Sequence, residues 1–119
     1  MKVVIAGSRN ISEQDSENYK MLIQTIKHAG YNIDQVVCGM AAGIDKLGHR
    51  YAFASNIPIV EMPADWSAHG KAAGPIRNRK MAEIADAAIV IWDGKSAGTL
   101  NMITEMNRLN KPCYIRIVT

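Results

Sequence analysis

Cysteine is scarce in this sequence: Cys38 and Cys113 are the two cysteines among 119 residues. They form no CxxC motif, and each lies in or beside an apolar run, so we expect reduced, buried thiols rather than a disulfide framework. Long apolar runs are missing too. The N-terminal run, residues 1–7, is too short for a signal peptide, and no stretch approaches the length of a transmembrane helix. These absences favour a cytoplasmic protein that does not act at a membrane.

The motifs of the common metal and cofactor sites are missing as well. His28, His49 and His69 lie far apart, and neither HExxH nor a Cys/His ligand spacing is present, so we predict no metal site. The patterns GxGxxG, GxxxxGKS and GxxxxGKT do not occur. These glycine patterns bind dinucleotide cofactors or the phosphates of hydrolysed nucleoside triphosphates. The sequence therefore predicts no cofactor.

No charge of one sign dominates the chain. It has 14 Lys and Arg residues against 11 Asp and Glu, a formal net charge of +3 and a pI of about 9.0. This mild basicity suits a ligand that carries phosphate, but it is too small to indicate nucleic acid by itself. Because 48% of the residues are hydrophobic and no linker or repeat interrupts the chain, residues 1–119 fit a single domain.

What the sequence does contain is a regular alternation of short apolar runs and helical patterns. Each apolar run has the length of a strand, and between the runs apolar residues recur at helical spacing, as at Tyr19, Leu22 and Ile26. Gly30 is a typical helix end, and Pro75 is typical of a first helical turn. The predicted strands span residues 2–6, 35–38, 57–61, 87–92 and 111–118.

Alternating strands and helices fold into a parallel sheet with helices on both faces. Right-handed crossovers leave few strand orders, so we expect a Rossmann-like three-layer α/β domain whose five strands follow the order 3-2-1-4-5. Residues 63–74 contain no such pattern and are predicted to form a long loop, which in so small a domain is typical of a functional segment.

Three glycine-bearing loops follow the first, second and fourth predicted strands. In a doubly wound sheet these loops meet beyond the carboxyl ends of the strands, where the strand order reverses and ligands bind. Glycine lets the main chain approach a ligand, and a helix N-terminus favours an anion such as phosphate. A plainer interpretation is that the glycines form turns, the arginine is a surface charge and the threonine caps a helix. The loop residues predicted to bind are Gly7, Ser8, Arg9, Gly39, Gly43, Gly94, Ser96, Gly98 and Thr99.

Further polar and aromatic side chains could complete this site. Asp93 directly follows a strand, where a carboxylate could accept a hydrogen bond from a ribose hydroxyl or cap the turn. Asp45 lies in the first turn of a helix and could contact a ligand or complement the helix dipole. Trp66 could stack on a base or pin the long loop. Basic and polar residues around the next helix start would add positive charge, unless they form a solvated face. The other predicted site residues are Lys71, Arg77 and Asn78.

Taken in order, these motifs resemble the YspA-like, cpYpsA-related branch of the SLOG superfamily. The resemblance covers nearly the whole chain and rests on Gly7-Ser-Arg9, Gly39-Met-Ala-Ala-Gly-Ile-Asp45, Pro63-Ala-Asp-Trp66, Gly70-Lys71, Ala73-Gly-Pro-Ile-Arg-Asn78, Met81 and Trp92-Asp-Gly-Lys-Ser-Ala-Gly-Thr99. It implies a Rossmann-like domain that senses or processes nucleotides or their derivatives. It also implies a homo-oligomer, a dimer or higher, because SLOG proteins often pair through helices beside the site.

The same superfamily holds the LOG phosphoribohydrolases, which cleave the N-glycosidic bond of nucleoside monophosphates, and the resemblance to them is incomplete. Their arginine falls on Arg77, followed by Asn78 where LOG enzymes have lysine. Their glutamate, in the pattern PGGxGTxxE, falls on Met102. Glu105 lies one turn further along and could substitute if the helix start were shifted, and Asp93 is a second candidate. If the chain is an enzyme, Arg77 and Glu105 are its predicted catalytic residues.

The sequence thus predicts binding or sensing of a small nucleotide or nucleotide-derived ligand through glycine-rich phosphate loops. Two alternatives stay open at this point. One is a phosphoribohydrolase-like N-glycosidase, although that chemistry needs a carboxylate near the ribose and Met102 stands in its place. The other is a binder of single-stranded nucleic acid of the DprA kind, which the small net charge does not favour.

Overall fold

Five parallel strands form one sheet in the order β3-β2-β1-β4-β5, which confirms the predicted strand order. The computed structural model describes all residues, 1–119. The strands are β1 (Lys2–Gly7), β2 (Gln35–Cys38), β3 (Ile59–Glu61), β4 (Ala87–Trp92) and β5 (Cys113–Ile117). The helices are α1 (Ser16–Ala29), α2 (Ile44–Ala54), α3 (Trp66–His69), α4 (Ala73–Ile84) and α5 (Ala97–Arg108), with one 3-10 turn, Gly70–Ala72.

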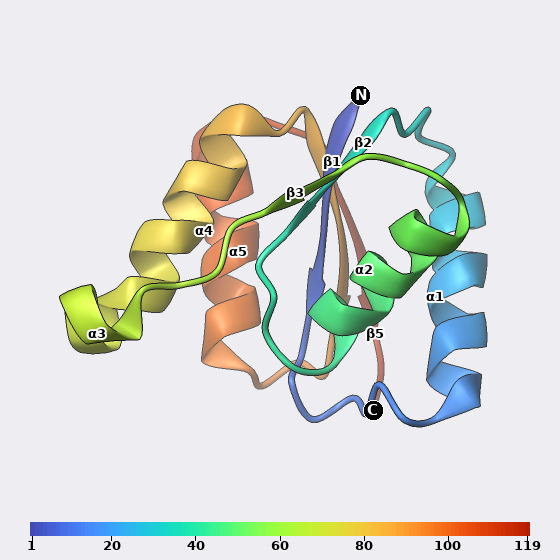
Figure 1. Cartoon of the computed structure of the whole chain (residues 1–119), viewed down its shortest axis with the longest axis horizontal. Helices are drawn as coiled ribbons and strands as arrows, with labels where there is room; N and C mark the ends of the chain where they lie inside the picture. Colours follow the sequence, from blue (N-terminus) through green and yellow to red (C-terminus); the bar gives the residue numbers. More distant parts are fainter.

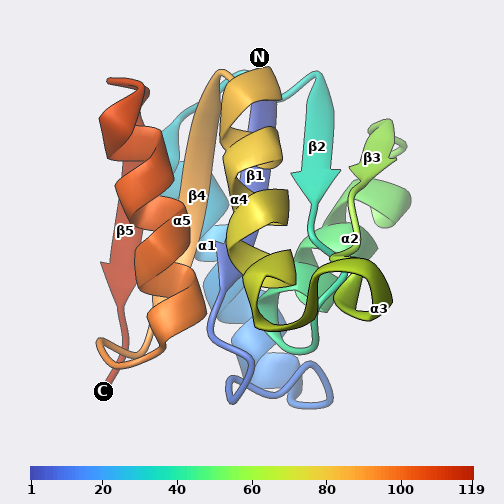
Figure 2. The ribbon, with the colours of Figure 1, turned by 90° about the vertical axis from the view of Figure 1, so that its left-hand side faces the viewer.

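The helices cover both faces of the sheet. In Figure 1 the sheet is seen close to edge-on, with α1 and α2 on one side and α4 and α5 on the other. Figure 2 shows the strands behind α4 and α5, with β1 and β4 side by side in the middle of the sheet. The register pairs Val3 with Ala87 at one end of β1 and Gly7 with Ile91 at the other. The loops after β1 and β4 therefore leave the sheet next to each other.

The central strands are apolar throughout because both of their faces are buried. Val3 and Ile5 of β1 pack against α1 and α2, whereas Val4 and Ala6 pack against α4 and α5. In β4, Ile89 packs on the side of α1 and α2, whereas the residues before and after it pack on the side of α4 and α5. The alternation of side chains along each strand thus supplies two hydrophobic cores, one on each side of the sheet.

Local sequence signals set both ends of α1. Asp15 caps α1 by accepting a hydrogen bond from the main-chain N–H of Glu17 at 2.9 Å, and Gly30 ends the helix with a left-handed φ of 71°. At the start of α5 the Ser96 side chain makes no capping hydrogen bond, and the starts of α2 and α4 also lack a side-chain cap. The first N–H groups of α5 therefore have neither an intrahelical acceptor nor a side-chain cap.

The structure corrects the prediction for residues 57–74. The third strand is shorter than expected, Ile59–Glu61, and the predicted long loop contains α3 and the 3-10 turn. Asp65 starts α3 by accepting a hydrogen bond from the main-chain N–H of Ala68 at 3.1 Å. Four-residue helices carry too little periodicity to be seen in a sequence. The consequence is that Trp66 lies on an ordered turn rather than on an irregular loop.

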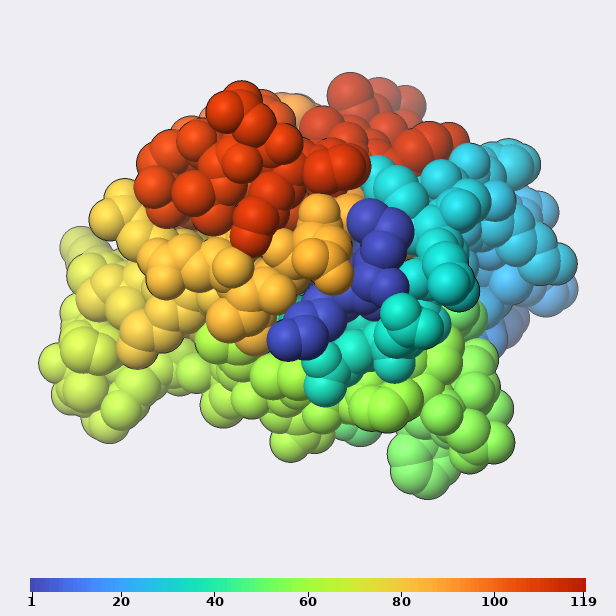
Figure 3. All heavy atoms as spheres, turned by 90° about the horizontal axis from the view of Figure 1, so that it is seen from above, coloured from blue at the N-terminus to red at the C-terminus, as the bar shows by residue number.

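Contacts of the N-terminus close the other end of the sheet. Figure 3 views the molecule from this end, where the N-terminal residues lie between the segments that precede β2 and β4. The amino group of Met1 pairs with Asp34 at 2.6 Å, and the main-chain N–H of Lys2 donates to the Asp86 carboxylate at 2.7 Å. None of the helices has the length and apolar character needed to cross a lipid bilayer.

Gly48 of α2 provides a test of how closely this helix packs on the sheet. A Cβ atom at Gly48 would lie 2.6 Å from the Cγ2 atom of Ile5 in β1. We expect Gly48→Ala to lower the free energy of unfolding by about 1–3 kcal/mol in urea denaturation, although alanine favours helices. Gly98→Ala is the matched control in α5, because a Cβ there meets no atom within 4 Å. Equal stabilities for the two variants would contradict this packing.

Candidate functional site

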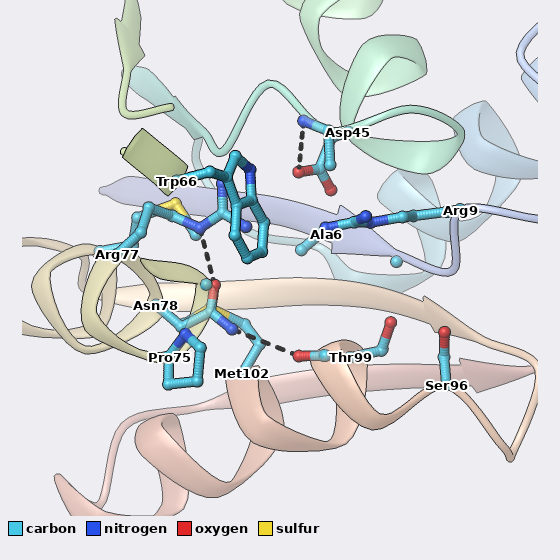
Figure 4. A pocket seen from close by; sticks show the side chains of 15 residues that line it. Ala6, Arg9, Asp45, Trp66, Pro75, Arg77, Asn78, Ser96, Thr99 and Met102 are labelled. Atoms are coloured by element: carbon cyan, nitrogen blue, oxygen red, sulfur yellow. Dashed lines mark hydrogen bonds between the residues drawn. The ribbon is translucent and has the colours of Figure 1, made fainter. Parts of the chain in front are cut away.

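A cavity of about 250 Å³ lies at the carboxyl ends of the strands, beside the point where β1 and β4 diverge. Figure 4 shows side chains from the loop after β1 and from α2, α3, α4 and α5 converging around it. The structure therefore brings together residues that are far apart in the chain. The predicted site residues that line this cavity are Gly7, Arg9, Asp45, Trp66, Arg77, Asn78, Ser96, Gly98 and Thr99.

The N-terminus of α5 opens directly onto the cavity. Thr99 is only 6% exposed, yet its hydroxyl group takes part in none of the hydrogen bonds within the protein. No fully enclosed side-chain oxygen lacks a partner, so the Thr99 oxygen must reach the cavity. Figure 4 shows the hydroxyl groups of Ser96 and Thr99 on the same side of α5, toward Arg9. Free N–H groups, two hydroxyls and a guanidinium group make this end of the cavity suitable for an anion.

Asp45 forms the opposite wall. It is 4% exposed, and its carboxylate accepts a hydrogen bond from the main-chain N–H of Ala41 at 3.2 Å, with the N–H of Gly7 as a second, weaker partner. Burial raises the pKa of Asp45 from 3.8 to about 6, because desolvation outweighs the hydrogen bonds from the Ala41 and Gly7 N–H groups and the positive charges of Arg77 and Arg9. No cation lies within 4 Å of the carboxylate. Asp45 is thus a buried carboxylate with unused hydrogen-bonding capacity facing a cavity.

Gly39 separates Asp45 from Arg77. A Cβ atom at Gly39 would lie 2.6 Å from the Nη1 atom of Arg77 and 2.8 Å from the Oδ2 atom of Asp45. The absence of a side chain is therefore what allows both groups to approach the same stretch of main chain. Gly39 itself lines a second hollow of about 180 Å³, which shares Arg9, Ala41, Trp66 and Arg77 with the first cavity.

The side chains of Arg77 and Asn78 both donate hydrogen bonds to other elements of the protein. Arg77 donates to the Gly39 carbonyl oxygen through Nη1 and to the Asn78 side-chain oxygen through Nε at 2.9 Å. Asn78 in turn donates to the side chain of Asn101 at 2.9 Å and to the carbonyl oxygen of Gly98 at 3.3 Å. The two side chains therefore tie α4 to the loop after β2 and to the first turns of α5. They position the cavity walls as well as lining them.

Arg9 and Trp66 lie across the mouth of the cavity. The guanidinium carbon of Arg9 is 5.7 Å from the centre of the Trp66 ring, a cation–π contact. The Trp66 side chain is 49% exposed and lines both hollows. Gly74 lies next to the ring at its Cη2 atom, since a Cβ there would be 3.4 Å from that atom. A flat exposed ring beside a cavity is suited to stacking on a base.

Several predicted residues lie around the cavity without lining it. Ser8 is fully buried, and its hydroxyl accepts from the main-chain N–H of Asp93 at 3.0 Å. Asp93 caps its own turn by accepting from the N–H groups of Ser96 at 2.8 Å and Lys95 at 2.9 Å, and these bonds lower its pKa. They hold the loop that shapes the α5 N-terminus. The predicted residues that line neither hollow are Ser8, Gly43, Lys71, Asp93 and Gly94.

Glu105 does not share a cavity with Arg77, which corrects the predicted catalytic pairing. Its carboxylate receives hydrogen bonds from Arg108 at 2.9 Å and Arg79 at 3.4 Å, and it lines a separate groove along α4 and α5. Burial acts to raise the pKa of Glu105, but the bonds from Arg108 and Arg79 lower it. The carboxylate that shares the cavity with Arg77 is Asp45, and Met102 lines it where the LOG pattern has glutamate.

The lining residues outside the predicted set are mostly small or apolar. Ala6 is the last inward-facing residue of β1 on the α4 and α5 side, so the alternation along that strand could have identified it. For the other lining residues, the sequence alone does not indicate a place at the cavity, except that they lie within the family motifs or next to a predicted site residue. These lining residues are Ala6, Ala41, Gly74, Pro75, Met81 and Met102.

Comparison with known proteins agrees with the fold and the motifs. The model of the YspA, cpYpsA-related SLOG family matches residues 1–69. The chain belongs to this family. The Gene 61 protein of Mycobacterium phage D29 is 30% identical to this SLOG protein over 117 residues, which cover 93% of this chain and 92% of the phage protein. SLOG membership associates the chain with nucleotide- or nucleic-acid-related functions in general.

A solved structure shares the fold of this SLOG protein. DNA processing protein A (DprA) from Streptococcus pneumoniae aligns with a TM-score of 0.74 and 20% sequence identity. The alignment covers 99% of this chain and 50% of the DprA chain, so this chain spans half the length of that protein. At this identity the likeness establishes the Rossmann-like α/β fold.

The raised pKa of Asp45 predicts how its replacement affects stability. Between about pH 4 and 6 the folded protein keeps a proton on Asp45 that the unfolded chain releases, so Asp45 lowers stability as the pH rises through this window. We expect Asp45→Asn to raise the free energy of unfolding at pH 7.5 by up to about 3 kcal/mol, with the gain vanishing near pH 4. Chemical denaturation at both pH values measures it.

Asp34→Asn is the control for that measurement, because it removes the same charge from a side chain that is 73% exposed; it also removes the ion pair with the Met1 amino group, and this loss acts to lower stability. We expect it to show no comparable gain at pH 7.5. A stability difference between wild type and Asp45→Asn that stays constant from pH 4 to 7.5 would contradict the raised pKa.

Proposed function

We propose that this SLOG protein binds a nucleotide or nucleotide-derived ligand whose phosphate lies at the N-terminus of α5. The observation that carries the proposal is the uncapped start of α5 in the cavity, with the buried Thr99 hydroxyl unpaired beside it. A helix N-terminus concentrates free N–H donors and the positive end of the helix dipole at one place. A phosphate group satisfies these donors better than water does.

Two further features favour an anion at the N-terminus of α5. Arg9 reaches the cavity from the loop after β1, and its guanidinium group offers the planar set of donors that matches a phosphate. Gly98 leaves open space above the first turn of α5, because a Cβ atom there would meet nothing within 4 Å. The phosphate would therefore be held from two elements, with room to approach the main chain.

The size and lining of the site favour a single nucleotide over a longer strand. Pockets for drug-sized ligands usually measure ~300–1,000 Å³, and this cavity of about 250 Å³ is smaller than that range. Trp66 provides a surface on which a base could stack at the mouth. The neighbouring second hollow offers additional space on the other side of the Arg9–Trp66 contact. These features support a mononucleotide-sized ligand.

Replacement of Thr99 tests the phosphate contact. We expect Thr99→Val, which keeps the shape of the side chain, to weaken binding of nucleoside 5′-monophosphates about tenfold, because a hydrogen bond to a charged group is lost. Isothermal titration calorimetry with the adenine, guanine, cytosine and uracil monophosphates measures it. Thr104→Val is the matched control, since Thr104 lies on the same helix and bonds only to the Leu100 carbonyl oxygen. If none of the four binds wild type at millimolar concentration, the proposed function fails.

Gly98→Ala tests the same place by filling it. The added methyl group meets no protein atom, so we expect a melting temperature no lower than that of wild type. We expect monophosphate binding to fall about tenfold or more, because the methyl group occupies the space that the phosphate needs. A variant that binds as tightly as wild type would show that the ligand does not approach this turn.

A further inference from the structure

Asp45 is the feature of the cavity that phosphate binding does not explain. It is the single carboxylate among the lining residues, and it lies where a phosphate would be repelled. A carboxylate can accept about four hydrogen bonds, yet the partners of Asp45 within the protein are the main-chain N–H groups of Ala41 and Gly7. Arg77 does not neutralise it by contact, because its guanidinium group is held by the carbonyl oxygen of Gly39 and by Asn78.

The two walls of the cavity therefore differ in electrostatic character. The α5 N-terminus and Arg9 attract negative charge, whereas Asp45 attracts hydrogen-bond donors. Both walls line the same cavity of about 250 Å³, so a ligand of modest size touches both. Such a ligand must present an anionic group at one end and hydroxyl or amino groups at the other.

The second hollow indicates where the rest of the ligand continues. It adjoins the first across Arg9 and Trp66, and its floor is formed by the loop from Gly39 to Ala42. Ala41 borders both hollows and also donates to Asp45, so the carboxylate lies close to the passage between them. A sugar at Asp45 would thus stand between a phosphate at α5 and a base beside Trp66, which is the order of groups in a nucleoside 5′-monophosphate.

Resting on the proposed function, we infer that Asp45 accepts hydrogen bonds from the sugar hydroxyl groups. The pocket then selects ribonucleoside 5′-monophosphates over their 2′,3′-dideoxy analogues. A buried charge left with so few partners lowers the stability of the protein, and such groups cluster at functional sites. The raised pKa of Asp45 has this origin. A bound diol supplies the missing donors.

Calorimetric titration at pH 7.5 tests this selectivity. The probes are the four ribonucleoside 5′-monophosphates, their 2′,3′-dideoxy counterparts and inorganic phosphate. For wild type we expect the best-bound ribonucleotide to bind about tenfold or more tighter than its dideoxy counterpart, because hydrogen bonds to a charged group are lost. For Asp45→Asn we expect this ratio to fall to about threefold or less, since the charged acceptor of the sugar hydroxyl groups is gone. Asp34→Asn is the control for the change in net charge.

The outcomes separate this inference from the proposed function. If monophosphates bind but wild type does not distinguish ribo from dideoxy sugars, the role of Asp45 is overturned and the phosphate site stands. The same holds if Asp45→Asn keeps the full ribose preference. The comparison of ribo and dideoxy nucleotides on wild type needs no variant. It therefore tests the inference even if Asp45→Asn fails to fold. If neither the nucleotides nor inorganic phosphate binds, both proposals fail.

Discussion

The parallel pairing of β1 with β4 is the constraint on which the rest of the site depends. Their register brings Gly7 opposite Ile91, so the chain leaves both strands at the same level of the sheet. A Cβ atom at Gly7 would lie 2.3 Å from the Ile91 carbonyl oxygen and 2.7 Å from the Ile44 side chain. This close approach lets the start of α2 and the loop before α5 share one edge of the sheet. The loops after β1 and β4 then lead to opposite faces of the sheet, and the cavity lies between them.

Most buried polar groups around the cavity are used to hold it in shape. Ser8 ties the loop after β1 to the loop after β4, and Arg77 and Asn78 tie α4 to its neighbours. Asp45 and Thr99 are the exceptions, because they are buried beside the cavity with hydrogen-bonding capacity left over. Groups of the first kind stabilise the scaffold, whereas those of the second kind cost stability until a ligand satisfies them.

Sequence periodicity was a sound guide to the strands and their order, since apolar runs buried on both faces leave a strong signal. It was a poor guide to individual side chains at the site. Asp93 and Asp45 looked equivalent as candidates, but Asp93 closes a local turn while Asp45 reaches the cavity. Glu105 lies one turn beyond the LOG glutamate position, yet Arg79 and Arg108 hold it in a different groove. Such outcomes depend on partners that lie elsewhere in the chain.

The sequence by itself determined the α/β architecture, the glycine loops and the SLOG family, because each depends on residues that are neighbours in the chain or are spaced by one structural period. The tertiary structure alone decided which polar groups face the cavity and which form hydrogen bonds that hold the fold together. The uncapped start of α5 and the partly satisfied Asp45 are visible only there. The physical reason is that burial and hydrogen bonding are set by contacts between α2, α4 and α5, which no local pattern encodes.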